Sequence, residues 1–210
     1  MSTHEREITR PVDLCRPDGR RLNPGARGWS RRPLHRANLA GGWGRNKRWD
    51  YWAVLTDDLV VSVTYADVDY LGLAVVGWIE LPTGRTGGHA ATVPLARGID
   101  LPEISGAAPL RYGDRHLDLA LVTDDGGTHI TATWTEADGR PGSLDVTIAD
   151  PPGHESLNVV IPWSLRRFQY TSKHQARPAT GTLIVGDDRR RLGGDGDGDG
   201  DGAWGVLDVG

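Results

Sequence analysis

The stretch LVVSVTY, residues 59–65, decides the fold class of this chain. Successive side chains of a strand point to opposite faces, so the apolar residues at its odd positions share one face, while Ser62 and Thr64 lie on the other. Alternation of this kind is typical of a half-buried antiparallel strand. The segments 117–121 (LDLAL) and 144–148 (LDVTI) alternate still more cleanly, which predicts further strands of the same type.

Turn signals separate these apolar segments. Residues 82–84 (PTG), 124–127 (DDGG), 138–139 (DG) and 186–188 (GDD) supply side chains that tolerate the left-handed backbone of tight turns. Parallel βαβ units need crossover helices, and no capped amphipathic run lies between the predicted strands. We therefore expect an all-β protein, an antiparallel meander that forms a barrel-like or a two-sheet structure.

The chain divides by composition into two parts. Residues 1–48 contain Gly, Pro and many arginines without a helical period, which predicts an irregular basic N-terminal arm with one short turn of helix. Residues 49–210 form the predicted β domain. Within it, residues 193–202 consist of Gly-Gly and four Asp-Gly pairs, a low-complexity tract that we expect to be a flexible loop.

Composition excludes several classes of protein. Of the 210 residues, 38% are hydrophobic and 25% charged, so the chain is too apolar for disorder and lacks the run of about 20 apolar residues that a membrane span needs. The first residues lack the apolar core of a secretory signal. A single cysteine, Cys15, closes no intrachain disulfide. We therefore expect a cytoplasmic protein.

Five ordered blocks together resemble a bacterial family, the domain of unknown function 2804. The blocks are residues 28–35 (GWSRRPLH), 47–52 (KRWDYW), 66–70 (ADVDY), 151–163 (PPGHESLNVVIPW) and 168–173 (FQYTSK). The resemblance spans about residues 14–208.

The resemblance carries three expectations. It implies that members continue well past Gly210, so that this chain is a truncated member. Two positions depart from the family: the Asp-Gly tract replaces a shorter loop, and Val209 stands where the family prefers tryptophan. More distantly, the pattern is similar to the lipocalin-related barrels that include carotenoid hydratases. That similarity implies a cavity for an apolar ligand.

The densest polar cluster lies between residues 152 and 158. On a strand, His154, Ser156 and Asn158 would share one face and Glu155 the other, which makes His154 and Glu155 candidate catalytic residues and Asn158 a candidate ligand contact. The alternative is a polar strand start that ties down neighbouring loops. A zinc-protease site is excluded because Asn158 stands where a second histidine is needed, and we expect no metal and no cofactor.

Residues 168–173 carry three further candidates. Gln169, Tyr170 and Lys173 belong to an alternating polar and aromatic strand, where a lysine beside a polar cavity would act as a base. The alternative for Lys173 is a solvated lysine.

The 47–52 and 66–70 blocks add Asp50, Asp69 and Tyr70. Asp67 and Asp69 would point the same way, and a pair of carboxylates can divide acid and base roles only if their environments differ. The alternative is a turn between residues 66 and 70 in which aspartates bond the local backbone. We expect His154, Gln169, Tyr170, Asp50 and Asp69 to approach one another.

Two other binding hypotheses, nucleic acid and calcium, are disfavoured. The basic arm carries Trp29, Trp43 and Trp49 between its arginines, a pattern that single-stranded nucleic acid favours, although the chain as a whole has a formal charge of −4. The Asp-Gly tract and Asp208 nearly match a calcium loop, but a repeated dipeptide matches any alternating template.

The favoured function is binding of a small apolar molecule in a barrel-like cavity, with or without a reaction at His154 and Glu155. A noncatalytic structural or interaction protein is the alternative, and a concave pocket lined by the polar blocks would decide between them. The apolar end of the chain, residues 204–209, predicts an open sheet edge and self-association.

Overall fold

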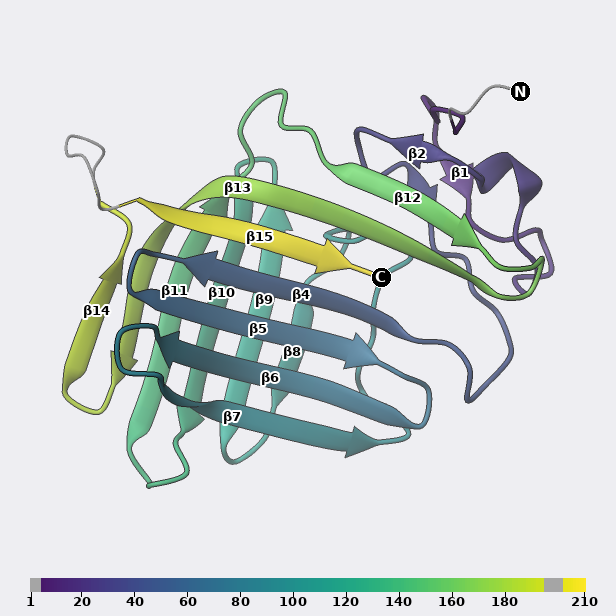
Figure 1. Ribbon diagram of the computed structural model, residues 1–210. Helices are drawn as coiled ribbons and strands as arrows, with labels where there is room; N and C mark the ends of the chain where they lie inside the picture. The colour runs from purple at the N-terminus through teal and green to yellow at the C-terminus, as the bar shows by residue number, and fades with distance from the viewer. Residues whose placement is uncertain (1–4, 195–201) are drawn as a thin grey trace.

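The computed structural model describes residues 5–194 and 202–210 and shows an all-β chain (Figure 1). The prediction of an antiparallel β fold is confirmed: the described part has one helical turn, the 3-10 helix η1 (Pro24–Ala26). The strands are β1 (Val12–Asp13), β2 (Trp29–Ser30), β3 (His35–Arg36), β4 (Arg48–Leu55), β5 (Leu59–Asp67), β6 (Leu71–Glu80), β7 (Arg85–Pro94), β8 (Leu110–Gly113), β9 (Leu117–Asp124), β10 (Gly127–Thr135), β11 (Pro141–Ala149), β12 (Leu157–Pro162), β13 (Phe168–Val185), β14 (Asp188–Leu192) and β15 (Ala203–Val209).

One 13-stranded antiparallel sheet curls into a half-barrel (Figure 1). Its main order is β7-β6-β5-β4-β15-β13-β11-β10-β9-β8, while β12 and β14 pair with β13, and β2 pairs with β12. Two meanders, β4 to β7 and β8 to β11, pair strands that are neighbours in sequence. The predicted turns at residues 82–84, 124–127 and 138–139 connect three of their six hairpins. β13 and β15 join these meanders across the sheet.

The core fills the inner face of the half-barrel. The alternating residues of β5, β9 and β11 bury their apolar side chains there, as their patterns predict. Tyr65, Ile130 and Ile148 are each less than 2% exposed. Burial of apolar area of this extent is the dominant favourable contribution to folding, at about 25 cal/mol per Å².

The C-terminal strand lies in the middle of the sheet. β15 pairs with β4 on one side and with β13 on the other, so the predicted open edge at residues 204–209 is wrong. Its backbone groups find partners in strands that are distant in sequence, which the local pattern does not reveal. Residues 195–201 of the Asp-Gly tract lie outside the described residues, so the prediction of a flexible loop there stays a prediction.

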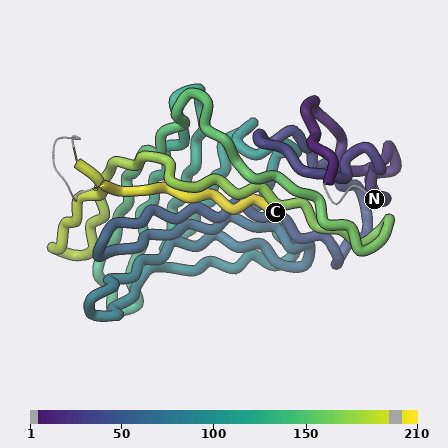
Figure 2. The backbone as a smooth tube through the Cα atoms, turned by 45° about the horizontal axis from the view of Figure 1, so that its top comes forward, coloured from purple at the N-terminus to yellow at the C-terminus, as the bar shows by residue number. Residues whose placement is uncertain are grey.

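The N-terminal segment packs against one end of the sheet (Figures 1 and 2). The predicted short turn of helix is present as η1, and the rest forms β1, β3 and a pairing of β2 with β12. A small second cluster joins Leu14, Leu22 and Ala26 to Val160 of β12. This segment therefore forms one wall above the extended end of β13.

Candidate functional site

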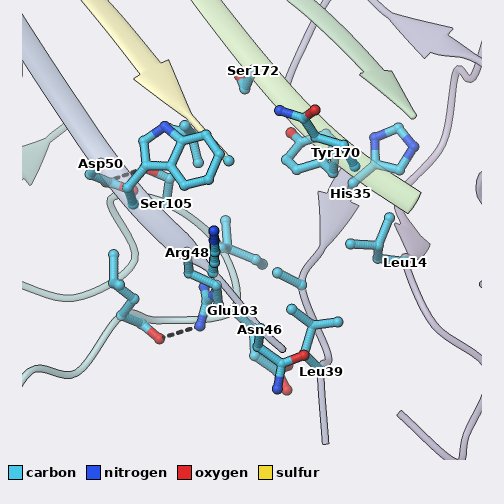
Figure 3. Close-up of a pocket in the computed structure, with 18 of the residues that line it drawn as sticks. Leu14, His35, Leu39, Asn46, Arg48, Asp50, Glu103, Ser105, Tyr170 and Ser172 are labelled. Carbon is cyan, nitrogen blue, oxygen red and sulfur yellow. Dashed lines mark hydrogen bonds between the residues drawn. The ribbon is translucent and has the colours of Figure 1, made fainter. Parts of the chain in front are cut away.

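A cleft of about 1690 Å³ opens between the N-terminal segment and the inner face of the sheet (Figure 3). Its walls come from β4, β13 and β15, from the loop at residues 101–106, and from the segments around residues 18–21 and 33–48. Chain segments far apart in sequence therefore share one concave space.

Strand register places polar and apolar side chains in rows across the cleft. Ser172 of β13 lies opposite Val209 of β15, and Val209 lies opposite Asp50 of β4. Residues directly opposite one another in an antiparallel ladder share a face, so this row points into the cleft, which all three residues line. Two residues along, His174 and Trp52 flank Leu207 in the same way.

A β-bulge brings a buried arginine to the inner face. The register of β13 against β15 shifts between His174 and Arg177, and Ala176 has a positive φ of 54°. The extra residue changes the alternation, so that Ser172 and His174 face the cleft before the bulge and the odd-numbered Arg177 faces it after the bulge. Arg177 is only 4% exposed and lines the cleft.

The Arg177 guanidinium is held on three sides. Its Nε donates to the Ala149 carbonyl at 2.7 Å, and its Nη2 lies 3.3 Å from the Asp150 carboxylate. The guanidinium carbon lies 5.4 Å from the ring centre of Trp52. Because these contacts fix its position, Arg177 presents oriented N–H donors to the cleft, while Asp150, which also lines the cleft, offsets part of its charge.

His174 and Ser172 form a hydrogen-bonded pair beside this cation. The His174 Nε2 to Ser172 Oγ distance is 3.0 Å. Burial, together with the charges of Arg177 and His154, lowers the pKa of His174 to about 4. The imidazole is therefore neutral near pH 7, and its Nδ1 atom is buried with no partner among the described residues.

Asp50 is a buried carboxyl group that accepts one hydrogen bond from a side chain. It is 5% exposed and accepts from Ser105 Oγ at 2.7 Å (Figure 3). Burial raises the pKa of Asp50, and the Ser105 hydrogen bond and the charge of Arg48 offset that rise only in part. Arg48 in turn donates to the carbonyl groups of Leu101 and Pro102, which holds the loop that carries Ser105.

Tyr170 and His35 form the opposite polar wall. Their ring centres are 4.9 Å apart, and Tyr170 Oη donates to Asn158 Oδ1 at 3.2 Å. Burial raises the pKa of Tyr170 to about 12. His35 bonds the Ala26 carbonyl through Nε2 at 2.9 Å, which leaves its buried Nδ1 as an acceptor with no partner in the described chain.

Three of the residues predicted from sequence line the cleft, namely Asp50, Gln169 and Tyr170. Asn158 lies behind Tyr170, fully buried, and its amide donates to the Ser30 carbonyl at 3.0 Å. His154 does not line the cleft, but its ring stacks on His174 with 5.9 Å between the ring centres.

The other predicted residues point elsewhere. Asp69 accepts hydrogen bonds from the backbone N–H groups of Arg45 and Asn46, each at 2.9 Å, and its own N–H bonds Asp67, which fits the turn interpretation. Tyr70 is 52% exposed. The remaining two form ion pairs, Lys173 with Asp208 at 2.5 Å and Glu155 with Arg31 at 2.9 Å.

The strand expected at residues 154–156 is absent. His154 follows a turn in which its N–H bonds the Pro151 carbonyl at 3.0 Å, and β12 begins only at Leu157. Pro151, Pro152 and Gly153 favour this turn and prevent the ladder from starting earlier. This turn leaves His154 stacked on His174 and Glu155 paired with Arg31.

Sequence reasoning missed the cleft residues His35, Ser105, His174 and Arg177. His174 continues the even-numbered alternation of Tyr170 and Ser172, a signal that was available in the sequence. Arg177 faces inward only because of the bulge, and its alternation with Tyr170 would predict the outer face.

In the stretches that the structure describes, no group of three or more His, Cys, Asp or Glu residues lies close enough to hold a metal ion. The same residues include no helix that is long and apolar enough to cross a membrane.

The fold is an antiparallel half-barrel, and a cleft lined by polar and apolar side chains lies on its inner face. Residues 5–210 match the family described as Domain of unknown function (DUF2804). The chain belongs to this family. No curated protein and no solved structure matches it.

Proposed function

We propose that the protein binds a small organic molecule in the cleft, with an apolar body along the sheet and a polar group at the inner end. The observation that carries this proposal is a pair of cleft-lining imidazoles, His35 and His174, each with a buried nitrogen that lacks a partner in the described residues. Buried polar atoms are ordinarily hydrogen-bonded, and a ligand would supply the missing partner.

The body of the ligand would contact apolar side chains. The cleft wall contains large apolar residues from five separate segments, and its volume exceeds the several hundred Å³ of a typical small-molecule site. These residues are Leu14, Leu39, Trp52, Leu101, Leu207 and Val209.

The polar group of the ligand would contact Ser172, His174 and Arg177. A neutral imidazole and a hydroxyl group both donate and accept hydrogen bonds, while a guanidinium only donates. An oxygen-rich group, a carboxylate or a sulfonate above all, satisfies all three, and the burial of Ser172 and Arg177 strengthens those bonds.

The test is a substitution on β15 that places a large side chain in the cleft. Val209 faces the cleft between Ser172 and Asp50, so Val209→Trp places an indole in the ligand's path. The probe is 1-anilinonaphthalene-8-sulfonate, which combines an apolar ring system with one anionic group and is followed by its fluorescence. We expect Val209→Trp to weaken probe binding about tenfold or more.

The matched control is Val206→Trp, which puts the same side chain on the opposite face of β15 and should leave probe binding unchanged. Circular dichroism checks that both variants fold. Equal probe affinity in Val209→Trp and the wild type would overturn the proposal. Mass spectrometry of small molecules retained by the purified protein would then identify the natural ligand.

A further inference from the structure

Exposed aromatic and aliphatic side chains lie on two loops at one end of the molecule, the end that holds the N-terminal segment (Figure 1). The loops at residues 41–47 and 163–167 lie at this same end in both views (Figures 1 and 2), and both line the cleft. Trp43 is 70% exposed, Trp163 67% and Leu165 52%. Exposure of this extent in neighbouring loops marks an interaction surface.

Exposed cations surround these side chains. They all line the cleft, and within the described ranges none of them forms an ion pair with a carboxylate. We call this set, together with Trp43, Trp163 and Leu165, the cationic rim; its cations are Arg20, Arg45, Lys47, Arg166 and Arg167.

The nearby carboxylates are already engaged. Asp18 pairs with Arg21, Glu103 pairs with Arg36, and Asp69 accepts two backbone hydrogen bonds. Asp69 is the one of these carboxylates whose charge no cation of the described residues pairs, and it offsets one of the five rim cations, so the rim keeps a net positive charge although the whole chain has a formal charge of −4. A local field of this sign attracts a polyanionic partner.

We propose that the cationic rim docks on the surface of an anionic lipid bilayer. Tryptophan rings settle at the boundary between headgroups and acyl chains, and each basic residue near an anionic surface adds attraction. Leu165 favours a bilayer over single-stranded nucleic acid, because an aliphatic side chain lacks the aromatic face on which bases stack best, whereas it enters the lipid interface readily. Docking goes beyond ligand binding and would place the mouth of the cleft at the bilayer.

The experiment is sedimentation of the full chain with vesicles of phosphatidylcholine alone, or of phosphatidylcholine mixed with phosphatidylglycerol. We expect binding to the mixed vesicles only, and weaker binding as salt is raised. Arg166→Ser combined with Arg167→Ser should weaken partitioning about tenfold or more. Trp163→Ser should weaken it several-fold.

The control variants remove two arginines or one tryptophan from parts of the surface outside the cationic rim. Arg115→Ser with Arg189→Ser, and separately Trp204→Ser, change exposed residues that do not line the cleft, and should bind vesicles like the wild type. Val209→Trp should also bind vesicles normally, so that docking and ligand binding are tested separately.

Two outcomes would overturn the proposal. One is equal sedimentation of the rim variants and the wild type with mixed vesicles. The other is absence of vesicle binding together with tight binding of oligothymidylate that depends on Arg166 and Arg167, which would assign the rim to nucleic acid instead.

Discussion

Two buried carboxyl groups, Glu136 in the packed region of the half-barrel and Asp50 in the cleft, have opposite surroundings. Glu136 is 7% exposed and accepts from Trp78 Nε1 at 2.8 Å, Trp134 Nε1 at 2.9 Å and the Gly88 N–H at 2.9 Å. Asp50 is 5% exposed and accepts from Ser105 alone among the described donors.

The pKa values follow this difference. Burial by itself would raise the pKa of Glu136, but its three hydrogen bonds and the charge of Arg140 outweigh burial and lower it. For Asp50 burial prevails and the pKa rises. In the packed region Glu136 has all the hydrogen-bond donors it needs from the protein. In the cleft Asp50 has one donor, which leaves room for hydrogen bonds to a ligand.

The largest expected effect comes from removing the satisfied carboxylate. Glu136→Ala leaves the Trp78, Trp134 and Gly88 donors buried without an acceptor, at about 1–3 kcal/mol each. We expect a loss of about 3 kcal/mol or more in the free energy of unfolding, measured with urea. Glu136→Gln keeps one oxygen as acceptor and should lose less. A Glu136→Ala protein as stable as the wild type would mean that these bonds contribute nothing net.

Acid should destabilise the cleft through His174. Its folded pKa of about 4 lies below the ordinary value of 6.5, so the folded state disfavours the protonated ring. The stability contribution of the neutral ring is complete above pH 6.5, falls as the pH drops, and is lost below about pH 4. The loss should be about 2–3 kcal/mol, allowing for partial exposure of the ring.

His174→Gln isolates this effect, because the amide keeps a hydrogen bond to Ser172 but does not titrate. The free energy of unfolding of both proteins is measured with urea between pH 4 and pH 7. As the pH falls, that of the wild type should decrease more than that of His174→Gln. Parallel curves would show that the ring is more solvated than its burial indicates.

A smaller effect of opposite sign is expected for Asp50→Asn. Because burial raises the folded pKa of Asp50 above 3.8, the ionised carboxylate costs stability at neutral pH, and that cost disappears as the pH falls towards the ordinary value. Asp50→Asn should therefore equal or exceed wild-type stability at pH 7 and lose this advantage near pH 4. A variant less stable than wild type at pH 7 would mean that the Ser105 hydrogen bond and the charge of Arg48 outweigh the burial of Asp50.

The strands were predictable because their signals are local. Alternation at residues 59–65 and glycine-containing turns such as residues 138–139 depend on neighbours in sequence, and the structure has β5 and the β10–β11 hairpin there. The position of β15 depends on β4 and β13, which lie far away in sequence. No local pattern encodes that pairing, so its two neighbours could not be predicted.

The cleft was predictable only in part for the same reason. Asp50 and Tyr170 stand in aromatic-rich blocks and do line the cleft, whereas Arg177 reaches it through a bulge at Ala176, a residue that seldom adopts positive φ. His154 and Glu155 were predicted because polar residues are dense in that segment. A dense run of polar residues does not determine which way each side chain points. The turn before β12 leaves Glu155 at the surface.

The smallest expected effect tests that surface position. Glu155→Gln removes one carboxylate of an ion pair whose side chains are 54% and 58% exposed, and such pairs are screened by water and salt. Arg31 keeps Glu7 as a second partner at 3.2 Å. We expect an unchanged urea midpoint and unchanged binding of 1-anilinonaphthalene-8-sulfonate, in contrast to Val209→Trp. Loss of probe binding in Glu155→Gln, with the midpoint unchanged, would move the ligand site from the cleft to the β12 side of the sheet.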